Sequence, residues 1–282
     1  MKNNGISMRL IIMNFLQYAI WGAYLTSMGS YLAGIGMSAK IGIFYAMQGI
    51  VSIFMPAIVG IIADKYIPAQ KVLSICHGLA GLFMIAAGWY GMSAGENVAF
   101  GHLFGLYSLS VAFYMPTIAL SNSVAYSGLE RYGLDTVKDF PPIRVFGTVG
   151  FICSMLFVNF MTIDGVQFQH SYNQFFTSGI IGLALCAFAL TLPPCPVSKT
   201  NEGTSFVDVF GLRAFSLFKK KDMAIFFIFS MLLGVSLQIT NGFANPFITS
   251  FASIPEYADS WGAQNANALI SISQISETLC IL

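Results

Sequence analysis

Three side chains of different chemistry lie at helical spacing within residues 139–151. Arg144, Thr148 and Phe151 are separated by four and then three residues, so a helix places them on one face. Pro141 and the proline that follows it predict that this helix begins there, because proline has no N–H group to lose in a first turn. A cation, a hydroxyl group and an aromatic ring on one face can bind a polar ligand. The alternative, for a helix that crosses a membrane, is an arginine that extends to the lipid headgroups.

Two further pairs of polar residues, each three residues apart, interrupt apolar segments. Gln238 and Asn241 place two side-chain amides on one face, where they can donate and accept hydrogen bonds. Gln274 precedes Glu277, which is the only carboxylate inside an apolar segment. Because burial favours the protonated form of a carboxyl group, Glu277 is a candidate for proton exchange. For both pairs the alternative is a hydrogen bond that only joins neighbouring helices.

The composition indicates a membrane protein. Of the 282 residues, 56% are hydrophobic and 9% are charged, and the mean hydropathy is +0.73, whereas soluble domains carry about 25% charged residues. The net charge of +1 gives no reason to expect nucleic-acid binding. The five cysteines include no C-x-x-C pair, so we expect free thiols, no metal site and no cofactor.

Eight apolar stretches have the length of roughly 20 residues, or more, that a helix needs to cross a bilayer. Their approximate bounds are 9–33, 41–62, 72–94, 98–122, 142–163, 172–193, 223–247 and 264–282. The first stretch exceeds the core of a signal peptide and has no clear small-x-small cleavage site, so we expect it to be retained. The fold class that follows is an all-α membrane protein.

Basic residues are distributed unevenly between the two sets of loops that these stretches define. With Arg144 left out, the loops on the side of the N-terminus hold eleven Lys and Arg residues, and the opposite loops hold only Lys40. Cytoplasmic loops carry an excess of Lys and Arg. We therefore expect a multi-pass protein of the inner or plasma membrane whose N-terminus lies in the cytoplasm.

The longest loop divides the chain into two parts. Residues 1–193 would form an N-terminal bundle of six helices, 194–222 a cytoplasmic loop, and 223–282 the start of a second bundle. Within the loop, residues 205–218 predict an amphipathic helix on the membrane surface. Six spans, a long cytoplasmic loop and further spans are the layout of a two-halved transporter. Because the eighth stretch ends without a basic flank, we expect the second bundle to be incomplete.

A short motif between the second and third stretches resembles one in a large transporter superfamily. Gly60, Asp64 and Lys65, followed by Lys71, are similar to the G-x-x-x-D-(R/K) loop of the major facilitator superfamily. The resemblance implies that this loop helps to close the cytoplasmic side of the transporter. A tight charged turn would explain the glycine and the lysines but not the whole spacing.

Longer stretches resemble one family within that superfamily, the nucleoside:proton symporters. The matching stretches are 15–17 with 21–22, 54–57, 63–65, 114–117, 139–151, 224–234, 237–241 and 271–278. The resemblance implies the fold of the major facilitator superfamily, here with six helices of the first bundle and helices seven and eight of the second. It also implies proton-coupled uptake of nucleosides by alternating access, in a protein that we expect to be monomeric.

The resemblance further implies a central nucleoside site. Its residues would be Arg144, Thr148, Phe151, Gln238, Asn241, Gln274 and Glu277, with Glu277 as the candidate for proton coupling. These are also the residues that polarity and helical spacing select. Two alternatives remain: a symporter of another polar substrate such as a sugar, and a fragment that does not transport. We do not expect an enzyme, because the sequence has neither an H-E-x-x-H zinc motif nor paired carboxylates within the apolar stretches.

Overall fold

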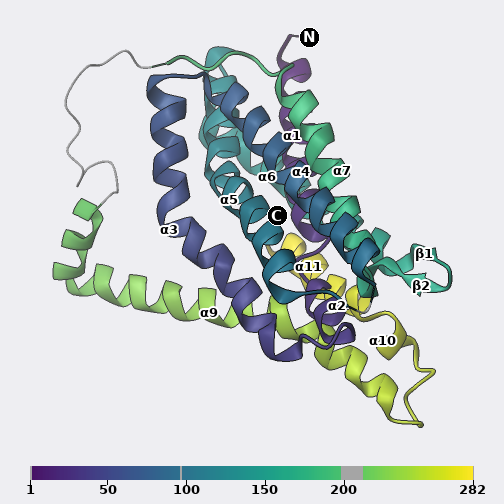
Figure 1. Cartoon of the computed structure of the whole chain (residues 1–282). Helices are drawn as coiled ribbons and strands as arrows, with labels where there is room; N and C mark the ends of the chain where they lie inside the picture. Colours follow the sequence, from purple (N-terminus) through teal and green to yellow (C-terminus); the bar gives the residue numbers. More distant parts are fainter. Residues whose placement is uncertain (1, 96, 198–211, 282) are drawn as a thin grey trace.

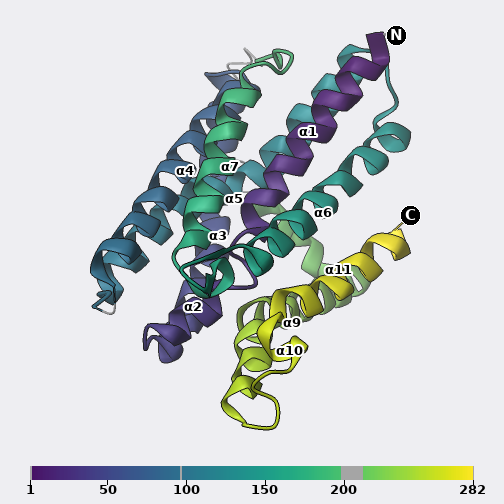
Figure 2. The ribbon, with the colours of Figure 1, turned by 90° about the vertical axis from the view of Figure 1, so that its right-hand side faces the viewer.

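Long helices that pack side by side make up most of the protein (Figures 1 and 2). The computed structural model describes residues 2–95, 97–197 and 212–281; the side chains of residues 2–4, 212–215, 277, 280 and 281 lie outside this description. The helices of the bundle are α1 (Lys2–Gly22), α3 (Ile41–Lys65), α4 (Ala69–Ala94), α5 (Phe100–Arg131), α6 (Thr136–Phe160) and α7 (Asn173–Ala189). Short elements join them: α2 (Met28–Gly34), η1 (Ser38–Lys40), β1 (Thr162–Ile163), β2 (Val166–Gln167) and η2 (Phe168–His170).

The remaining helices are η3 (Leu212–Lys219), α9 (Lys221–Ser250), η4 (Phe251–Ser253), α10 (Trp261–Gln264) and α11 (Ala266–Ile281). Of these, α9 and α11 contact the bundle, whereas η3 contacts α9 (Figures 1 and 2). Helix α9 contacts α2 and α3, and α11 runs along α6. Helices α2 and α10 and the hairpin of β1 and β2 lie toward the end of the molecule opposite the N-terminus (Figure 1).

Several of these helices meet the requirements for crossing a bilayer. In the described part of the chain, five helical segments are long and apolar enough: 38–65, 69–94, 100–131, 136–160 and 221–253. Helix α7 is a shorter apolar helix. Outward-facing apolar side chains such as Ile53, Trp89 and Phe229 are at least 61% exposed, which is suitable for contact with lipid. The expectation of an all-α membrane protein is therefore confirmed.

The first predicted span was wrong in its bounds. Helix α1 begins at Lys2 and ends at Gly22, and α2 follows only after a turn. The side chains in this turn bind other parts of the protein: Thr26 donates to Asn267 at 2.9 Å, and Ser27 donates to Gln174 at 3.0 Å. Hydropathy does not report such contacts, because they join residues that are distant in sequence.

The predicted start of the fifth helix was also wrong. Helix α6 begins at Thr136, and both prolines lie inside it. Asp135 caps the helix, since its carboxylate accepts hydrogen bonds from the N–H groups of Val137 (2.8 Å) and Lys138 (3.4 Å). Asp139 in turn accepts from the N–H group of Asp135 at 2.8 Å. This reciprocal cap supplies a start signal stronger than that of the prolines.

Two motifs also differ from their predicted structure. The segment from Gly60 to Lys65 lies in the last turns of α3 and not in a loop. Of the surface helix predicted at 205–218, residues 205–211 lie outside the described residues, and the rest belong to the 3₁₀ helix η3. Helix α5 continues to Arg131, nine residues past its predicted end at 122.

Glycines allow α1 and α6 to approach closely. A Cβ atom added to Gly150 would overlap the backbone carbonyl of Phe15, and one added to Gly22 would overlap the carbonyl of Phe151. At Gly147 the added atom would lie 2.6 Å from the Tyr18 ring. Small residues are the usual means of close helix packing in a membrane. This contact sets the distance between the Arg144 face of α6 and the aromatic side chains of α1.

We predict that Gly150→Ala destabilises the protein. Because the new methyl group meets backbone and not a flexible side chain, α1 and α6 must separate, at a cost of about 1–3 kcal/mol. The measurement is the thermal unfolding midpoint in detergent. Gly105→Ala in α5 is the control, since a Cβ atom there meets nothing within 4 Å. Equal midpoints for Gly150→Ala and the unsubstituted protein would contradict the role of this contact.

Candidate substrate-binding site

A cavity with an empty volume of about 630 Å³ lies between α1, α6, α9 and α11. Polar and aromatic side chains line it together. It therefore has the mixed lining expected of a site for a small polar ligand with an aromatic part.

Helix α6 contributes all three residues selected from its sequence. Arg144, Thr148 and Phe151 line the cavity. The guanidinium carbon of Arg144 lies 3.9 Å from the centre of the Tyr18 ring, within cation–π range. The arginine thus points into the protein, not outward to the headgroups. Tyr18 holds the guanidinium by its ring face, and among the described side chains no carboxylate pairs with Arg144.

Helices α9 and α11 contribute one amide each. Asn241 of α9 and Gln274 of α11 line the same cavity. Glu277 follows Gln274 by about one turn in α11, but its side chain lies outside the described residues. The structure thus brings together five of the seven predicted site residues: Arg144, Thr148, Phe151, Asn241 and Gln274.

Gln238 lies apart from this group. Its Nε2 atom donates to the backbone carbonyl of Tyr45 in α3 at 3.1 Å. It lines a second cavity, of about 600 Å³, together with Tyr45, Gln48 and other residues. Trp21 lines both cavities and stands between them.

The residues that α1 places in the cavity were not predicted from the sequence. Tyr18 and Trp21 line it, as do Leu25 and, from α9, Leu237. The only signal was the position of Trp21 one turn after Gln17 in a span that carries several polar residues. Aromatic residues are frequent in this chain, so their type alone does not separate a binding residue from a packing residue.

The predicted gate residues are not among the residues that line the cavity. Gly60, Asp64 and Lys65 are in the last turns of α3, and the side chains of Asp64 and Lys65 are exposed. Their role in closing the cytoplasmic side stays a prediction.

A buried polar network joins α9 and α11 to the turn after α1, to α2 and to η2. Helix α2 lies at the end of the molecule opposite the N-terminus (Figure 1). The Nδ2 atom of Asn245 in α9 donates to Asn267 of α11 at 2.7 Å and to Gln169 of η2 at 3.2 Å. Ser30 of α2 donates to the Asn245 side-chain oxygen, and Thr26 donates to that of Asn267 at 2.9 Å. We call these five residues the far-end network. All five are buried, so each hydrogen bond is protected from water.

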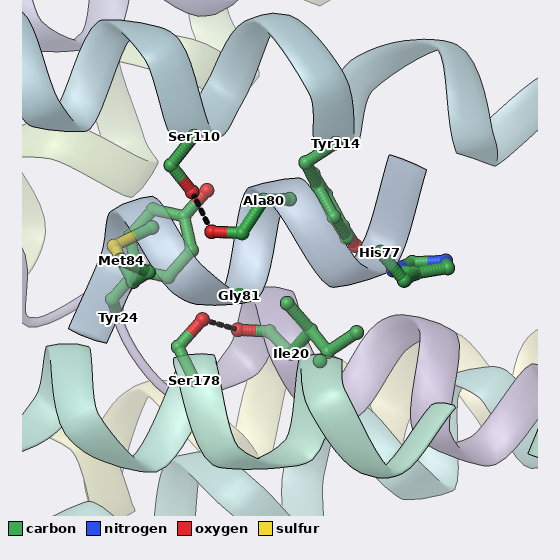
Figure 3. A pocket seen from close by; sticks show the side chains of 10 residues that line it. Ile20, Tyr24, His77, Ala80, Gly81, Met84, Ser110, Tyr114 and Ser178 are labelled. Carbon is green, nitrogen blue, oxygen red and sulfur yellow. Dashed lines mark hydrogen bonds between the residues drawn. The ribbon is translucent and has the colours of Figure 1, made fainter. Parts of the chain in front are cut away.

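A smaller cavity lies inside the bundle, between α1, α4, α5 and α7, with an empty volume of about 220 Å³ (Figure 3). Its hydroxyl groups serve the bundle itself: Ser110 donates to the Ala80 carbonyl at 2.7 Å, and Ser178 to the Ile20 carbonyl at 2.9 Å. His77 lies at its edge, with Nε2 2.8 Å from Gln17 Oε1. Among the described residues, no group of three His, Cys, Asp or Glu side chains is placed to hold a metal ion.

Comparisons with known proteins identify the family to which the chain is similar. The family model described as "Nucleoside H+ symporter" matches residues 4–282. The xanthosine permease and the nucleoside permease NupG of Escherichia coli K12 are each 44% identical to the chain over 281 residues, which is 98% of this chain and 64% of each relative. The chain therefore spans slightly less than two-thirds of the length of these relatives.

Solved structures give the same result. A crystal structure of a mutant of the nucleoside transporter NupG superimposes with a TM-score of 0.86 at 42% identity, over 97% of this chain and 66% of that one. A second crystal structure of NupG gives 0.81 at the same identity, over 98% of this chain. The expected fold of the major facilitator superfamily is thus confirmed for the part that the chain spans. This chain belongs to the nucleoside H⁺ symporter family.

Proposed function

We propose that the protein takes up nucleosides together with protons across the inner membrane by alternating access. The observation that carries the proposal is the cavity that gathers Arg144, Thr148, Phe151, Asn241 and Gln274 from three helices. The names of the relatives, a xanthosine permease and a nucleoside permease, support the substrate class. Each is a permease, and we propose transport without enzymatic conversion of the substrate.

The side chains of the cavity suit the chemistry of a nucleoside. A nucleoside is uncharged and presents sugar hydroxyls, ring acceptors and exocyclic donors. The amides of Asn241 and Gln274 can both donate and accept, as can the Thr148 hydroxyl. Arg144 can only donate hydrogen bonds. One face of its planar guanidinium lies over the Tyr18 ring, so the N–H groups at its edge stay available to a ligand. The site therefore has partners for both the sugar and the base.

The far-end network supports a two-state mechanism. It joins α9 and α11 to the bundle through neutral hydrogen bonds, with no ion pair among its members. Each such bond contributes a net free energy of about 1 kcal/mol, so the protein can break it and form other contacts during a transport cycle. With the N-terminus in the cytoplasm, the network lies on the outer side. We propose that it holds the outer side shut in the conformation described here.

Uptake into proteoliposomes tests the proposed function. Radiolabelled uridine or adenosine should accumulate in vesicles that contain the protein when an inward proton gradient is imposed, and not when the gradient is collapsed. Competition by unlabelled ribose or glucose at the strength of unlabelled nucleoside would indicate a sugar transporter instead. Vesicles that neither bind nor accumulate either class would favour a chain that does not transport.

We predict that Asn241→Ala and Gln238→Ala have unequal effects. Asn241 lines the cavity, so its loss leaves a ligand group unpaired and should weaken nucleoside binding roughly tenfold or more. Gln238 donates to the Tyr45 carbonyl and lines the other cavity, so its loss should act mainly on stability, by about 1 kcal/mol. Binding of labelled uridine and the thermal midpoint separate the two. Equal loss of binding in both variants would place Gln238 in the site as well.

The proton-coupling role of Glu277 is tested by Glu277→Gln, which removes the charge and keeps the shape. If Glu277 carries the proton, the variant should still exchange labelled nucleoside between the two sides of the vesicle but lose the response to a pH gradient, because an amide does not titrate. A fall in both binding and exchange would instead indicate a ligand group. Gradient-driven accumulation at the unsubstituted level would exclude both roles.

We predict that Asn245→Leu opens the outer side. Leucine cannot replace the hydrogen bonds from Asn245 to Asn267 and Gln169 or the one from Ser30, so the closed state should lose about 1–3 kcal/mol. Spin labels at positions 40 and 256, in a cysteine-free background, report the distance across this end. The distance distribution should gain a longer component. Ser253→Ala is the control, since the Ser253 hydroxyl donates to the Ser250 carbonyl. An unchanged distance distribution in Asn245→Leu would contradict the proposal that the far-end network holds the outer side shut.

A further inference from the structure

Three aromatic rings line the proposed nucleoside cavity, and they differ in the surface that they leave for a ligand. The ring of Tyr18 is covered on one face by the Arg144 guanidinium at 3.9 Å. Phe151 is only 8% exposed, so most of its ring is already packed. Trp21 is only partly buried and faces the cavity. Of these three rings, Trp21 therefore offers the largest free aromatic surface.

The indole of Trp21 is held by a hydrogen-bond relay that crosses three helices. Its Nε1–H group donates to Oε1 of Gln48 in α3 at 3.3 Å. Nε2 of Gln48 donates in turn to the hydroxyl of Tyr107 in α5 at 2.9 Å. Gln48 is 4% exposed and Tyr107 is fully buried, so the bond between these two side chains is protected from water. The relay fixes the plane of the indole, as a ring that receives a flat ligand requires.

The same relay determines what Trp21 can offer. An indole has one polar hydrogen, and Gln48 already accepts it. Trp21 is therefore left with its π face as a contact surface and has no donor for a sugar hydroxyl. Its position between the two cavities also allows the base to lie against it while the sugar reaches the polar groups of α6, α9 and α11.

We propose that Trp21 is the ring on which the nucleobase stacks and that Gln48, acting through Trp21, is a positioning residue. This inference rests on the proposed function and names the group that recognises the base. Every nucleobase has a π face, so stacking accepts purines and pyrimidines alike. It would discriminate against a free sugar, which has no ring to stack. Trp21 thus gives the site selectivity for nucleosides as a class.

Tryptophan fluorescence tests the stacking directly. The chain has three tryptophans, and the other two, Trp89 and Trp261, are 62% and 56% exposed. Trp89→Phe combined with Trp261→Phe leaves Trp21 as the only indole. Adenosine or uridine should quench its emission in a saturable manner, with the same midpoint as binding of the radiolabelled compound. Ribose should leave the emission unchanged.

Variants separate the roles of ring and relay. Trp21→Leu should weaken binding of adenosine and uridine roughly tenfold or more, and Trp21→Phe should weaken it less, because a smaller ring still stacks. Gln48→Met keeps the volume and removes the acceptor of the indole N–H, so the Trp21 emission should shift to shorter wavelength and affinity should fall about threefold to tenfold. Gln70→Met is the matched control: Gln70 is equally buried but accepts from the Cys195 N–H, away from Trp21.

Four results would count against the inference, and they can be distinguished. Unchanged uridine affinity in Trp21→Leu would exclude the stacking role and leave the proposed function intact. The same holds for saturable uridine binding that does not alter Trp21 emission. Absence of uridine and adenosine binding in the unsubstituted protein would overturn the proposed function and this inference together. A shift in Trp21 emission that occurs equally in Gln70→Met would exclude Gln48 as the positioning residue.

Discussion

A polar group inside a lipid bilayer must find its partner within the protein, and most of this structure follows from that constraint. Water is absent from the hydrocarbon region, so backbone N–H and C=O groups are paired in helices. Many buried polar side chains are paired within the protein as well. Gln17, which is fully buried, donates to Thr117 at 2.8 Å and pairs with His77 at 2.8 Å, so its amide joins α1 to α4 and α5. Such pairs set the rotation of each helix as well as its position.

Helix α1 takes part in many of these contacts, although it is less apolar than the helices identified as spans. Gly22 of α1 and Gly150 of α6 bring the two backbones together. Tyr18 of α1 holds Arg144, and Trp21 donates a hydrogen bond to Gln48 in α3. The turn that follows α1 reaches α11 through Thr26. The helix thus carries polar residues because it lies at the centre, between the interior of the bundle and the proposed substrate cavity. The polar content that makes it central also explains why α1 is not among the segments that length and hydropathy identify as spans.

The cavity and the far-end network represent two uses of the same side-chain chemistry. In the network, each amide is paired with another protein group and fully buried, as Asn245 is with Asn267 and Gln169. In the cavity, Asn241 and Gln274 are only partly buried and face open volume. A neutral amide loses little free energy when it changes partners, whereas a buried ion pair would hold the two parts of the chain together at a high cost of separation. Neutral amides are therefore suited to a contact that must be made and broken.

The sequence by itself determined the features that depend on local periodicity and composition. Long apolar stretches specified the helices, and a spacing of four and three residues placed Arg144, Thr148 and Phe151 on one face, because 3.6 residues per turn is a property of the helix alone. Only the tertiary structure decided which way each face points. Gln238 and Asn241 are about 60° apart around α9, yet one lines the predicted cavity and the other bonds to Tyr45. Trp21 gained its position from Gln48, which is 27 residues away, and the turn after α1 gained its shape from Asn267, 241 residues from Thr26. These contacts join distant segments, and the rotation of one helix against another is fixed by packing that no single segment encodes.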